Sequence, residues 1–191
     1  MKQIRLCGSG GQGVITAAII LAEAVIMEGQ EAVQSQSYGP EARGGTSNAE
    51  VIIGEHFIYH PKVIRPDVVL ALTQQAADKY SAGLCGKGVL IIDEDLVPKS
   101  PIHPNLVKVP MTRLAKEGLG KDLFTNIVAL GLLVKVTGVV SLETIQKAVA
   151  NRVPKATIEK NMKALQIGYD IGIMQNNVRF LPQLNNLSLT S

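Results

Sequence analysis

The order of apolar and polar positions predicts alternating strands and helices over the first 110 residues of the chain. Short apolar runs bounded by glycine or proline predict buried strands, and longer ones predict helices. The predicted strands span residues 4–7, 32–37, 47–53, 67–72, 89–92 and 106–109. The predicted helices span residues 14–28 and 73–81, the second with Thr73 as its N-cap. Gly54-Glu55 is a candidate turn that would pair residues 47–53 with residues 57–59.

After Pro110 the pattern becomes helical, and we expect four helices, over residues 111–116, 123–137, 142–151 and 156–176. Ser141 is placed to cap the third of these, with Glu143 in its first turn. The fold class we predict is α/β, a three-layer α/β/α arrangement with a mostly parallel Rossmann-like sheet and a C-terminal helical extension. We expect residues 1–180 to form a single domain and residues 181–191 a polar tail.

The composition of the chain argues against some classes of function. The 191 residues are 46% hydrophobic and carry a net charge of +3, without a basic cluster, which disfavours nucleic acid and membrane surfaces as partners. The apolar stretches 14–27 and 123–140 contain charged residues and fall short of the ~20 apolar residues that cross a bilayer. We find no secretory signal before the first strand, so we expect a cytoplasmic protein with reduced thiols. Cys7 and Cys85 are predicted to be small buried hydrophobes.

The first candidate binding element is a glycine-rich loop between the first predicted strand and helix. Its residues fit the pattern G-x-G-x-x-G and are Gly8, Ser9, Gly10, Gly11, Gln12 and Gly13. Glycines let a ligand approach the backbone N–H groups, and the start of the helix adds its positive dipole end. A nicotinamide site is disfavoured because no acid ends the second strand, where the ribose would be read. The other alternative is that the glycines serve only close packing of strand and helix.

The second candidate element is the loop that follows residues 32–37. Tyr38 offers a ring and a hydroxyl, and Arg43 a bidentate fork for a phosphate or carboxylate. If the first two strands are adjacent and parallel, both loops leave the same carboxyl edge of the sheet, where open α/β sheets bind ligands. The alternative is a surface turn in which Glu41 neutralises Arg43. The remaining candidate binding residues of this second loop are Gly44 and Gly45.

Other polar residues give weaker signals. His56, His60 and His103 show no metal-binding spacing. Asp93-Glu94-Asp95 follows a predicted strand, so one of its acids could be functional. We favour the alternative that this segment is a helix cap or a solvated turn.

Together, the motifs Gly8-Ser9-Gly10-Gly11-Gln12-Gly13-Val14 and Ser37-Tyr38-Gly39-Pro40-Glu41-Ala42-Arg43-Gly44-Gly45 closely resemble the gamma subunits of 2-oxoacid:ferredoxin oxidoreductases. Residues 67–72, Asn126–Gly131 and the later Asn161, Ala164 and Gly168 extend this resemblance over most of residues 1–180. The form Ser-Tyr-Gly-Pro-Glu is most similar to the 2-oxoglutarate branch, although the pyruvate, 2-ketoisovalerate (branched-chain) and indolepyruvate relatives share much of the pattern.

This resemblance implies a role in oxidative decarboxylation of a 2-oxoacid, with coenzyme A as acyl acceptor and ferredoxin as electron acceptor. It implies alpha and beta subunits as partners, with a ferredoxin-like delta subunit as an open addition. Thiamine diphosphate, Mg²⁺ and iron–sulfur clusters are expected in those partners, because this chain has only two cysteines and no magnesium–diphosphate motif. The glycine loop, Tyr38, Glu41, Arg43, Gly44 and Gly45 are the candidate residues for coenzyme A, and we predict no catalytic residue and no metal ligand in this chain.

The isolated chain is therefore expected to be inactive. Whether it forms a homodimer when isolated is left undecided by the sequence. Two other functions remain as alternatives, a stand-alone nucleotide- or coenzyme A-binding module and a purely structural scaffold subunit.

Overall fold

The structure, a computed structural model, describes residues 1–37 and 45–174, which contain one six-stranded sheet. Its strands follow the order β2-β3-β1-β4-β5-β6. Their bounds are β1 (Lys2–Ser9), β2 (Glu31–Ser37), β3 (Thr46–Gly54), β4 (Val68–Ala71), β5 (Val89–Asp93) and β6 (Leu106–Val109). β1, β4, β5 and β6 pair in parallel, whereas β3 runs antiparallel to both β2 and β1. The predicted α/β class with a mostly parallel sheet is confirmed.

Two details of strand pairing differ from the sequence prediction. β1 and β2 point the same way but are not adjacent, because β3 lies between them. The hairpin predicted around Gly54-Glu55 is wrong. β3 already pairs along both of its edges, with β1 and with β2, so residues 57–59 find no free edge there and form no strand.

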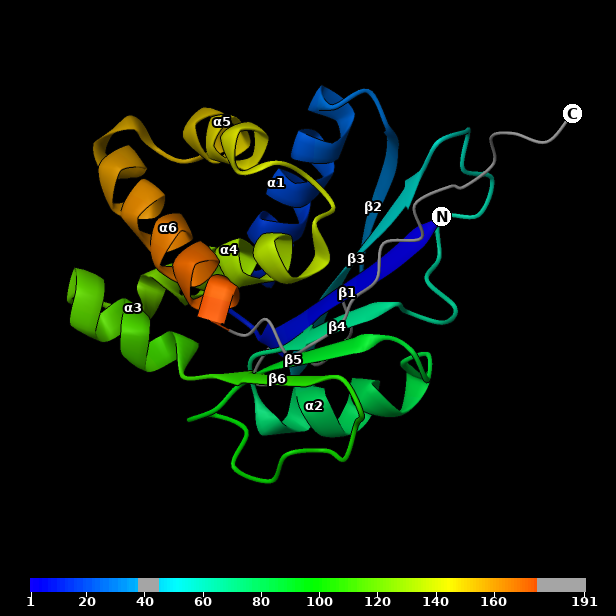
Figure 1. Cartoon of the computed structure of the whole chain (residues 1–191), viewed down its shortest axis with the longest axis horizontal. Coiled ribbons are helices and arrows are strands. Elements are labelled where there is room, and N and C mark those ends of the chain that lie inside the picture. The colour runs from blue at the N-terminus through cyan, green and yellow to red at the C-terminus, as the bar shows by residue number, and fades with distance from the viewer. Residues whose placement is uncertain (38–44, 175–191) are drawn as a thin grey trace, which may run out of the picture.

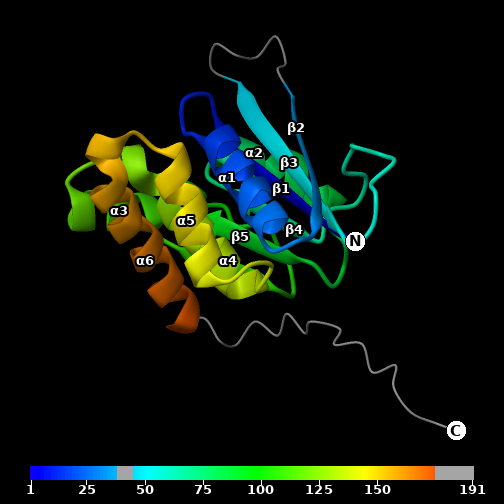
Figure 2. The ribbon, with the colours of Figure 1, turned by 90° about the horizontal axis from the view of Figure 1, so that it is seen from above.

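Helices cover the two faces of the sheet unequally (Figures 1 and 2). Short α2 lies on one face and the five other α-helices gather on the opposite face, which gives the predicted three layers. The bounds are α1 (Val14–Met27), α2 (Gln74–Tyr80), α3 (Met111–Leu119), α4 (Thr125–Thr137), α5 (Leu142–Arg152) and α6 (Ile158–Met174), with single 3-10 turns η1 (Ser81–Gly83), η2 (Asp122–Phe124) and η3 (Lys155–Thr157). Among the described residues, none of these helices is long and apolar enough to span a bilayer.

Alternation along β1 separates the two apolar cores. Ile4 and Leu6 face the large core beneath α1 and α4, while Cys7 joins the smaller core under α2. The helical extension shares the large core, because α4 is buried on nearly all sides and Ala164 and Leu165 of α6 pack into the same cluster. The single domain over residues 1–180 remains a prediction, and the predicted tail lies outside the described residues.

The two predicted N-caps are confirmed. The Thr73 hydroxyl accepts a hydrogen bond from the Ala76 N–H at 3.3 Å, and the Ser141 hydroxyl accepts one from the Thr144 N–H at 3.2 Å. The Ser141 N–H in turn donates to the Glu28 carboxylate at 2.7 Å, so the end of α1 is tied to the start of α5.

This tie predicts a pH dependence of stability. Partial burial raises the pKa of Glu28, but hydrogen bonds from Ser141 and Thr144 outweigh it, and the pKa lies below the ordinary value of 4.5. A carboxylate with a lowered folded-state pKa stabilises the protein above its unfolded pKa, and that contribution is lost as the pH falls through the folded value. We expect Glu28→Gln to reduce the dependence of the melting temperature on pH below about 4.5, measured by circular dichroism. A pH profile identical to that of the wild type would contradict the role assigned to this carboxylate.

Candidate functional site

The glycine loop joins β1 to α1 at the carboxyl edge of the parallel strands. Gly11 has a φ of 88° and Gly13 a φ of 73°, both in the left-handed region that favours glycine. Gly13 is the N-cap of α1 and no side chain caps this end of the helix, whose first internal hydrogen bond runs from Ala17 N–H to Gly13 carbonyl. The first-turn N–H groups of α1 therefore have no acceptor within the helix, as an anion site requires.

Two of the motif glycines make room for side chains of this chain. The Gln12 Oε1 accepts a hydrogen bond from the Ser9 N–H at 2.7 Å, and a Cβ on Gly8 would collide with that Oε1. On the other side, Asn126 of α4 donates a hydrogen bond from its Nδ2 to the Gly13 carbonyl at 3.2 Å. A Cβ on Gly13 would lie only 2.5 Å from that Nδ2. Close contacts within this chain therefore favour glycine at positions 8 and 13. A Cβ on Gly11, by contrast, would meet open space.

The open side of the glycine loop faces a pocket of about 360 Å³. Its walls come from the loop, the segment after β5, the start of α3, η2 and the start of α4. The lining residues are Gly11, Gln12, Leu96, Thr112, Lys116, Asp122, Leu123 and Thr125. Sequence reasoning missed all of these except Gly11 and Gln12. Their position in the chain could have identified some of them, because residues 94–97 and 110–116 directly follow predicted strands and so lie at the ligand-binding edge of the sheet.

The pocket combines polar donors with an apolar rim. Leu96 is 37% exposed and Leu123 is 69% exposed, so both offer apolar surface at its mouth. Lys116 lines the same pocket as the glycine loop, and its Nζ is 3.3 Å from a carboxylate oxygen of Asp122. Both partners of this pair are more than half exposed, so the pair is weak and a ligand anion can compete for the lysine.

Asp93 fixes the wall between β5 and α3. It is fully buried, and its carboxylate accepts hydrogen bonds from the N–H and hydroxyl of Thr112 at 2.8 and 2.7 Å and from the N–H groups of Asp95 and Leu96 at 3.0 and 3.2 Å. All of its hydrogen-bonding capacity is used within the protein. Asp93 thus stabilises the turn at residues 94–96 and ties it to the first turn of α3, whose N-cap is Pro110, and the residue is buried rather than solvated.

The second predicted loop is only partly described. Tyr38, Glu41, Arg43 and Gly44 lie in residues 38–44, outside the described residues. Gly45 precedes Thr46, which pairs with Ser9 at the end of β1, and Ser37 pairs with Asn48. The flanks of the second loop thus leave the sheet at the edge of the glycine loop, as predicted, although β3 separates the two strands.

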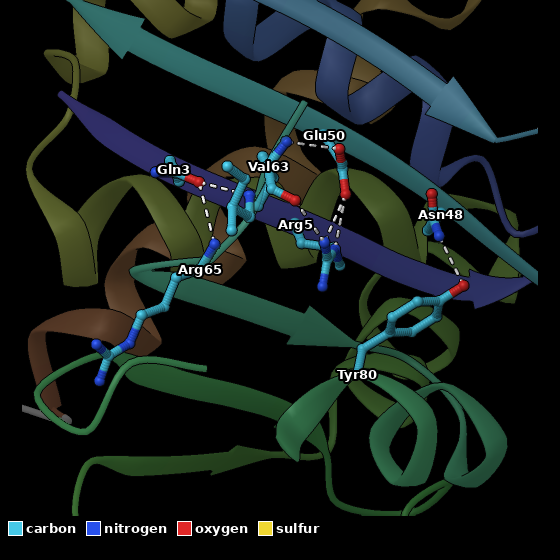
Figure 3. A network of polar contacts seen from close by, with 8 residues as sticks. Gln3, Arg5, Asn48, Glu50, Val63, Arg65 and Tyr80 are labelled. Atoms are coloured by element: carbon cyan, nitrogen blue, oxygen red, sulfur yellow. Dashed lines mark hydrogen bonds and ion pairs between the residues drawn. The ribbon is translucent and has the colours of Figure 1, made fainter. Parts of the chain in front are cut away.

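A second hollow, of about 390 Å³, lies on the face of β1, β2 and β3 that carries polar side chains. Its lining residues are Arg5, Ser35, Gln36, Ser37, Asn48, Glu50, Pro61 and Lys62. Figure 3 shows that Arg5 and Glu50 point toward one another in this region, with an ion-pair distance of 2.7 Å. Because these two charges bind each other, the hollow is a weaker anion site than the pocket at the glycine loop.

In the described part of the chain, no three His, Cys, Asp or Glu residues gather as metal ligands. Both cysteines are free, and burial raises the pKa of the Cys7 thiol well above its ordinary value, which leaves an unreactive side chain. The prediction of a buried hydrophobe is confirmed for Cys7. Cys85 is only partly buried, with its sulfur 3.8 Å from an Asp67 carboxylate oxygen.

Comparison with known proteins places this arrangement among oxidoreductase subunits. The sequence model of the family described as pyruvate ferredoxin/flavodoxin oxidoreductase matches residues 3–171. The chain is 48% identical over 174 residues to the 2-oxoglutarate synthase subunit KorC of Methanocaldococcus jannaschii, a match that covers 89% of this chain and 93% of that protein.

Solved structures agree with the sequence match. The gamma subunit of a keto/oxoacid ferredoxin oxidoreductase from Geobacter sulfurreducens is similar, with a TM-score of 0.83 and 48% identity over 91% of this chain and 99% of that chain. The 2-oxoglutarate:ferredoxin oxidoreductase from Magnetococcus marinus, solved with 2-oxoglutarate, coenzyme A and succinyl-CoA bound, has a TM-score of 0.75 and covers 99% of this chain and 33% of that chain. Its identity of 21% makes this a likeness of fold alone.

Proposed function

The chain belongs to the pyruvate ferredoxin/flavodoxin oxidoreductase family, and from that premise we propose that it is the gamma subunit of a 2-oxoglutarate:ferredoxin oxidoreductase. The observation that carries the substrate is the 48% identity to a KorC subunit over nearly the whole of both chains. The complex converts 2-oxoglutarate, coenzyme A and two oxidised ferredoxins to succinyl-CoA, CO₂, a proton and two reduced ferredoxins. The family resemblance predicted from the two loops is thereby confirmed.

The residues of this chain suit a supporting role in that reaction. Two cysteines are too few for an iron–sulfur cluster, which ordinarily takes four cysteine ligands. We therefore assign the clusters to the alpha and beta subunits, and to a delta subunit where the complex has one. The family resemblance assigns thiamine diphosphate and Mg²⁺ to those partners as well. We expect the complex in the cytoplasm.

The pocket at the glycine loop fits one end of coenzyme A. The glycine loop, at the positive end of the α1 dipole, and the Lys116 ammonium suit its phosphates, while Leu96 and Leu123 suit the less polar pantetheine arm. Gln12 has a particular part in this site, because its Oε1 is already held by the Ser9 N–H. Its Nε2 has no hydrogen-bond partner among the described residues and is left to donate to a ligand. The predicted contributions of Tyr38, Glu41, Arg43, Gly44 and Gly45 to the same ligand remain predictions.

The experiment that tests the function is reconstitution with the alpha and beta subunits of the complex. We expect CoA-dependent ferredoxin reduction with 2-oxoglutarate, at a kcat/KM at least tenfold higher than with pyruvate or 2-oxoisovalerate, and no activity of the isolated chain. Faster turnover of pyruvate would overturn the substrate. Full turnover by the isolated chain would overturn the role as a subunit.

A second experiment tests the coenzyme A site. Gln12→Glu keeps an oxygen for the Ser9 N–H but replaces the Nε2 donor with a second carboxylate oxygen, whose charge repels phosphate. We expect the KM for coenzyme A to rise about tenfold, or 1.4 kcal/mol, while the KM for 2-oxoglutarate is unchanged. Lys116→Ala should raise the KM for coenzyme A about fivefold, because an exposed cation contributes less.

Lys87→Ala is the matched control for the lysine, since Lys87 is exposed and precedes β5 at the amino end of the parallel strands, the opposite end from the pocket. If both pocket variants leave the KM for coenzyme A at the control value in an active complex, the loop contacts protein only and the chain is a structural scaffold. Tight binding of coenzyme A to the isolated chain, measured by calorimetry, together with failure to assemble, would favour a stand-alone binding module.

A further inference from the structure

Residues 55–66 form an irregular segment that exposes large apolar side chains. The segment connects β3 to β4 at the amino end of the parallel strands, beside the N-terminus and at the opposite end of β1 from the glycine loop (Figures 1 and 2). Phe57 is 70% exposed, Tyr59 80% and Ile64 83%. The Phe57 and Tyr59 rings pack edge to face with centroids 5.0 Å apart, so they form one aromatic patch.

Buried side chains hold this exposed segment firmly to the sheet. Ile58 and Val63 pack with Ile52 in a small apolar cluster beneath it. These two anchors face inward, and the exposed Phe57, Tyr59 and Ile64 are their neighbours in sequence. The outward position of the exposed side chains is therefore imposed by the packing of the inward ones.

A polar network fixes the backbone of the same segment (Figure 3). The Glu50 carboxylate accepts a hydrogen bond from the Val63 N–H at 3.1 Å, and the Arg5 guanidinium donates to the Val63 carbonyl at 3.2 Å. The Gln3 side-chain oxygen accepts hydrogen bonds from the N–H groups of Ile64 and Arg65 at 2.9 and 3.3 Å. Three side chains of the sheet thus hold three consecutive residues of the segment.

This arrangement suits a binding surface. The Arg5 and Glu50 side chains are 14% and 12% exposed, so the pair carries a desolvation penalty while it holds the backbone of the segment. A preorganised loop loses little conformational entropy on association. Aromatic side chains are the usual anchors of protein interfaces, where a few residues carry most of the binding free energy.

Charges around the aromatic patch indicate which kind of partner it fits. The segment carries two exposed cations, Lys62 and Arg65, and one acid, Glu55. A two-fold contact with a second copy of this chain would bring the same cationic patch against itself, which is unfavourable. An apolar surface bordered by carboxylates is complementary to it.

We propose that Phe57, Tyr59 and Ile64, with Lys62 and Arg65 at their border, form the surface on which a larger subunit of the complex docks through an apolar patch bordered by acidic side chains. We call these five residues the docking surface. The proposal rests on the proposed function, because it requires assembly with larger subunits. It lies at the opposite end of β1 from the glycine loop, so it is a separate surface from the pocket proposed for coenzyme A.

The test measures association of the full-length chain with the remaining purified subunits. In the variant Phe57→Ser/Tyr59→Ser, the Kd should rise at least about 100-fold, or about 2.8 kcal/mol, because aromatic anchors carry a large share of the binding free energy. Ile26→Ser/Ile102→Ser is the matched control, since both isoleucines are more than half exposed and lie outside the docking surface, and its Kd should stay within threefold of the wild type. Thermal melts of the isolated chains should agree closely, because all four side chains are exposed.

A charge test identifies the acidic border. Lys62→Glu/Arg65→Glu should slow association at least tenfold at low salt and weaken its dependence on ionic strength. Lys160→Glu/Lys163→Glu makes the same charge change on exposed residues of α6 and should leave the association rate within threefold of the wild type.

The outcomes separate the two proposals. If the wild-type chain binds no larger subunit, the proposed function fails and the docking surface fails with it. If the wild type assembles and the serine variant binds as tightly as its control, only the docking surface is overturned. A homodimer of the isolated chain that the serine variant abolishes would assign the surface to a second copy and would also overturn it.

Discussion

Replacing Gly168 with alanine is expected to lower the free energy of unfolding by about 3 kcal/mol and the melting temperature by about 10 °C. α4 and α6 approach each other backbone to backbone at two glycines (Gly131 and Gly168). A Cβ on Gly168 would collide with the Val128 carbonyl and lie 2.9 Å from the Leu132 nitrogen. Helix backbone cannot give way as a side chain can, so the two helices would have to separate. The gain in helix propensity from glycine to alanine, about 1 kcal/mol, is too small to compensate.

Gly118→Ala is the matched control because it makes the same change inside another helix. Its Cβ would lie 2.7 Å from the terminal Cδ1 of Ile167, which can rotate away. We expect this variant to be within about 1 kcal/mol of the wild type, and differential scanning calorimetry of both variants makes the comparison. Equal melting temperatures for the two variants would show that α6 does not depend on close backbone contact.

The same glycines show what the sequence could and could not predict about the fold. Gly131 and Gly168 were matched only as part of a family resemblance, because periodicity predicts that a helix exists but not which residues of two helices touch. The strands were predicted well, since continuous apolar runs such as residues 89–92 leave few alternatives in a sheet covered on both faces. The pairing of β3 was predicted wrongly, with residues 57–59 in place of β1 and β2, because an alternating pattern shows which face is buried but not which strands lie alongside.

The candidate site was predicted where one continuous segment forms it and missed where distant segments meet. The glycine loop carries its own signal, since left-handed turns at Gly11 and Gly13 require glycine. The roles of Gln12 and Asn126 depend on contacts within the folded chain, with Asn126 reaching Gly13 from more than a hundred residues away. Nothing in the sequence around Lys116 or Leu123 distinguishes them from ordinary surface residues. Only the folded structure brings them into the same pocket as the loop.

Replacing Glu50 with alanine is expected to destabilise the protein by about 3 kcal/mol, because it leaves the guanidinium of Arg5 without its anion in a largely buried position. The change also removes the acceptor of the Val63 N–H, which adds an unpaired donor beneath the docking surface. The measurement is urea unfolding followed by circular dichroism, with hydrogen exchange at residues 63–65 as a local readout. Faster exchange there would follow from release of the segment.

A double substitution separates the ion pair from packing. Arg5→Met/Glu50→Leu replaces both charges with apolar groups of similar length, and apolar replacements of buried pairs are often neutral or stabilising. We expect it to recover at least half of the stability that Glu50→Ala loses, while exchange at Val63 stays fast because no acceptor returns. The segment should then keep its apolar anchors, Ile58 and Val63, but lose its fixed backbone.

If the docking surface depends on preorganisation, this variant folds normally and yet binds the larger subunits more weakly than the wild type. Full binding by a variant whose segment exchanges rapidly would show that the exposed side chains suffice without the network that holds them.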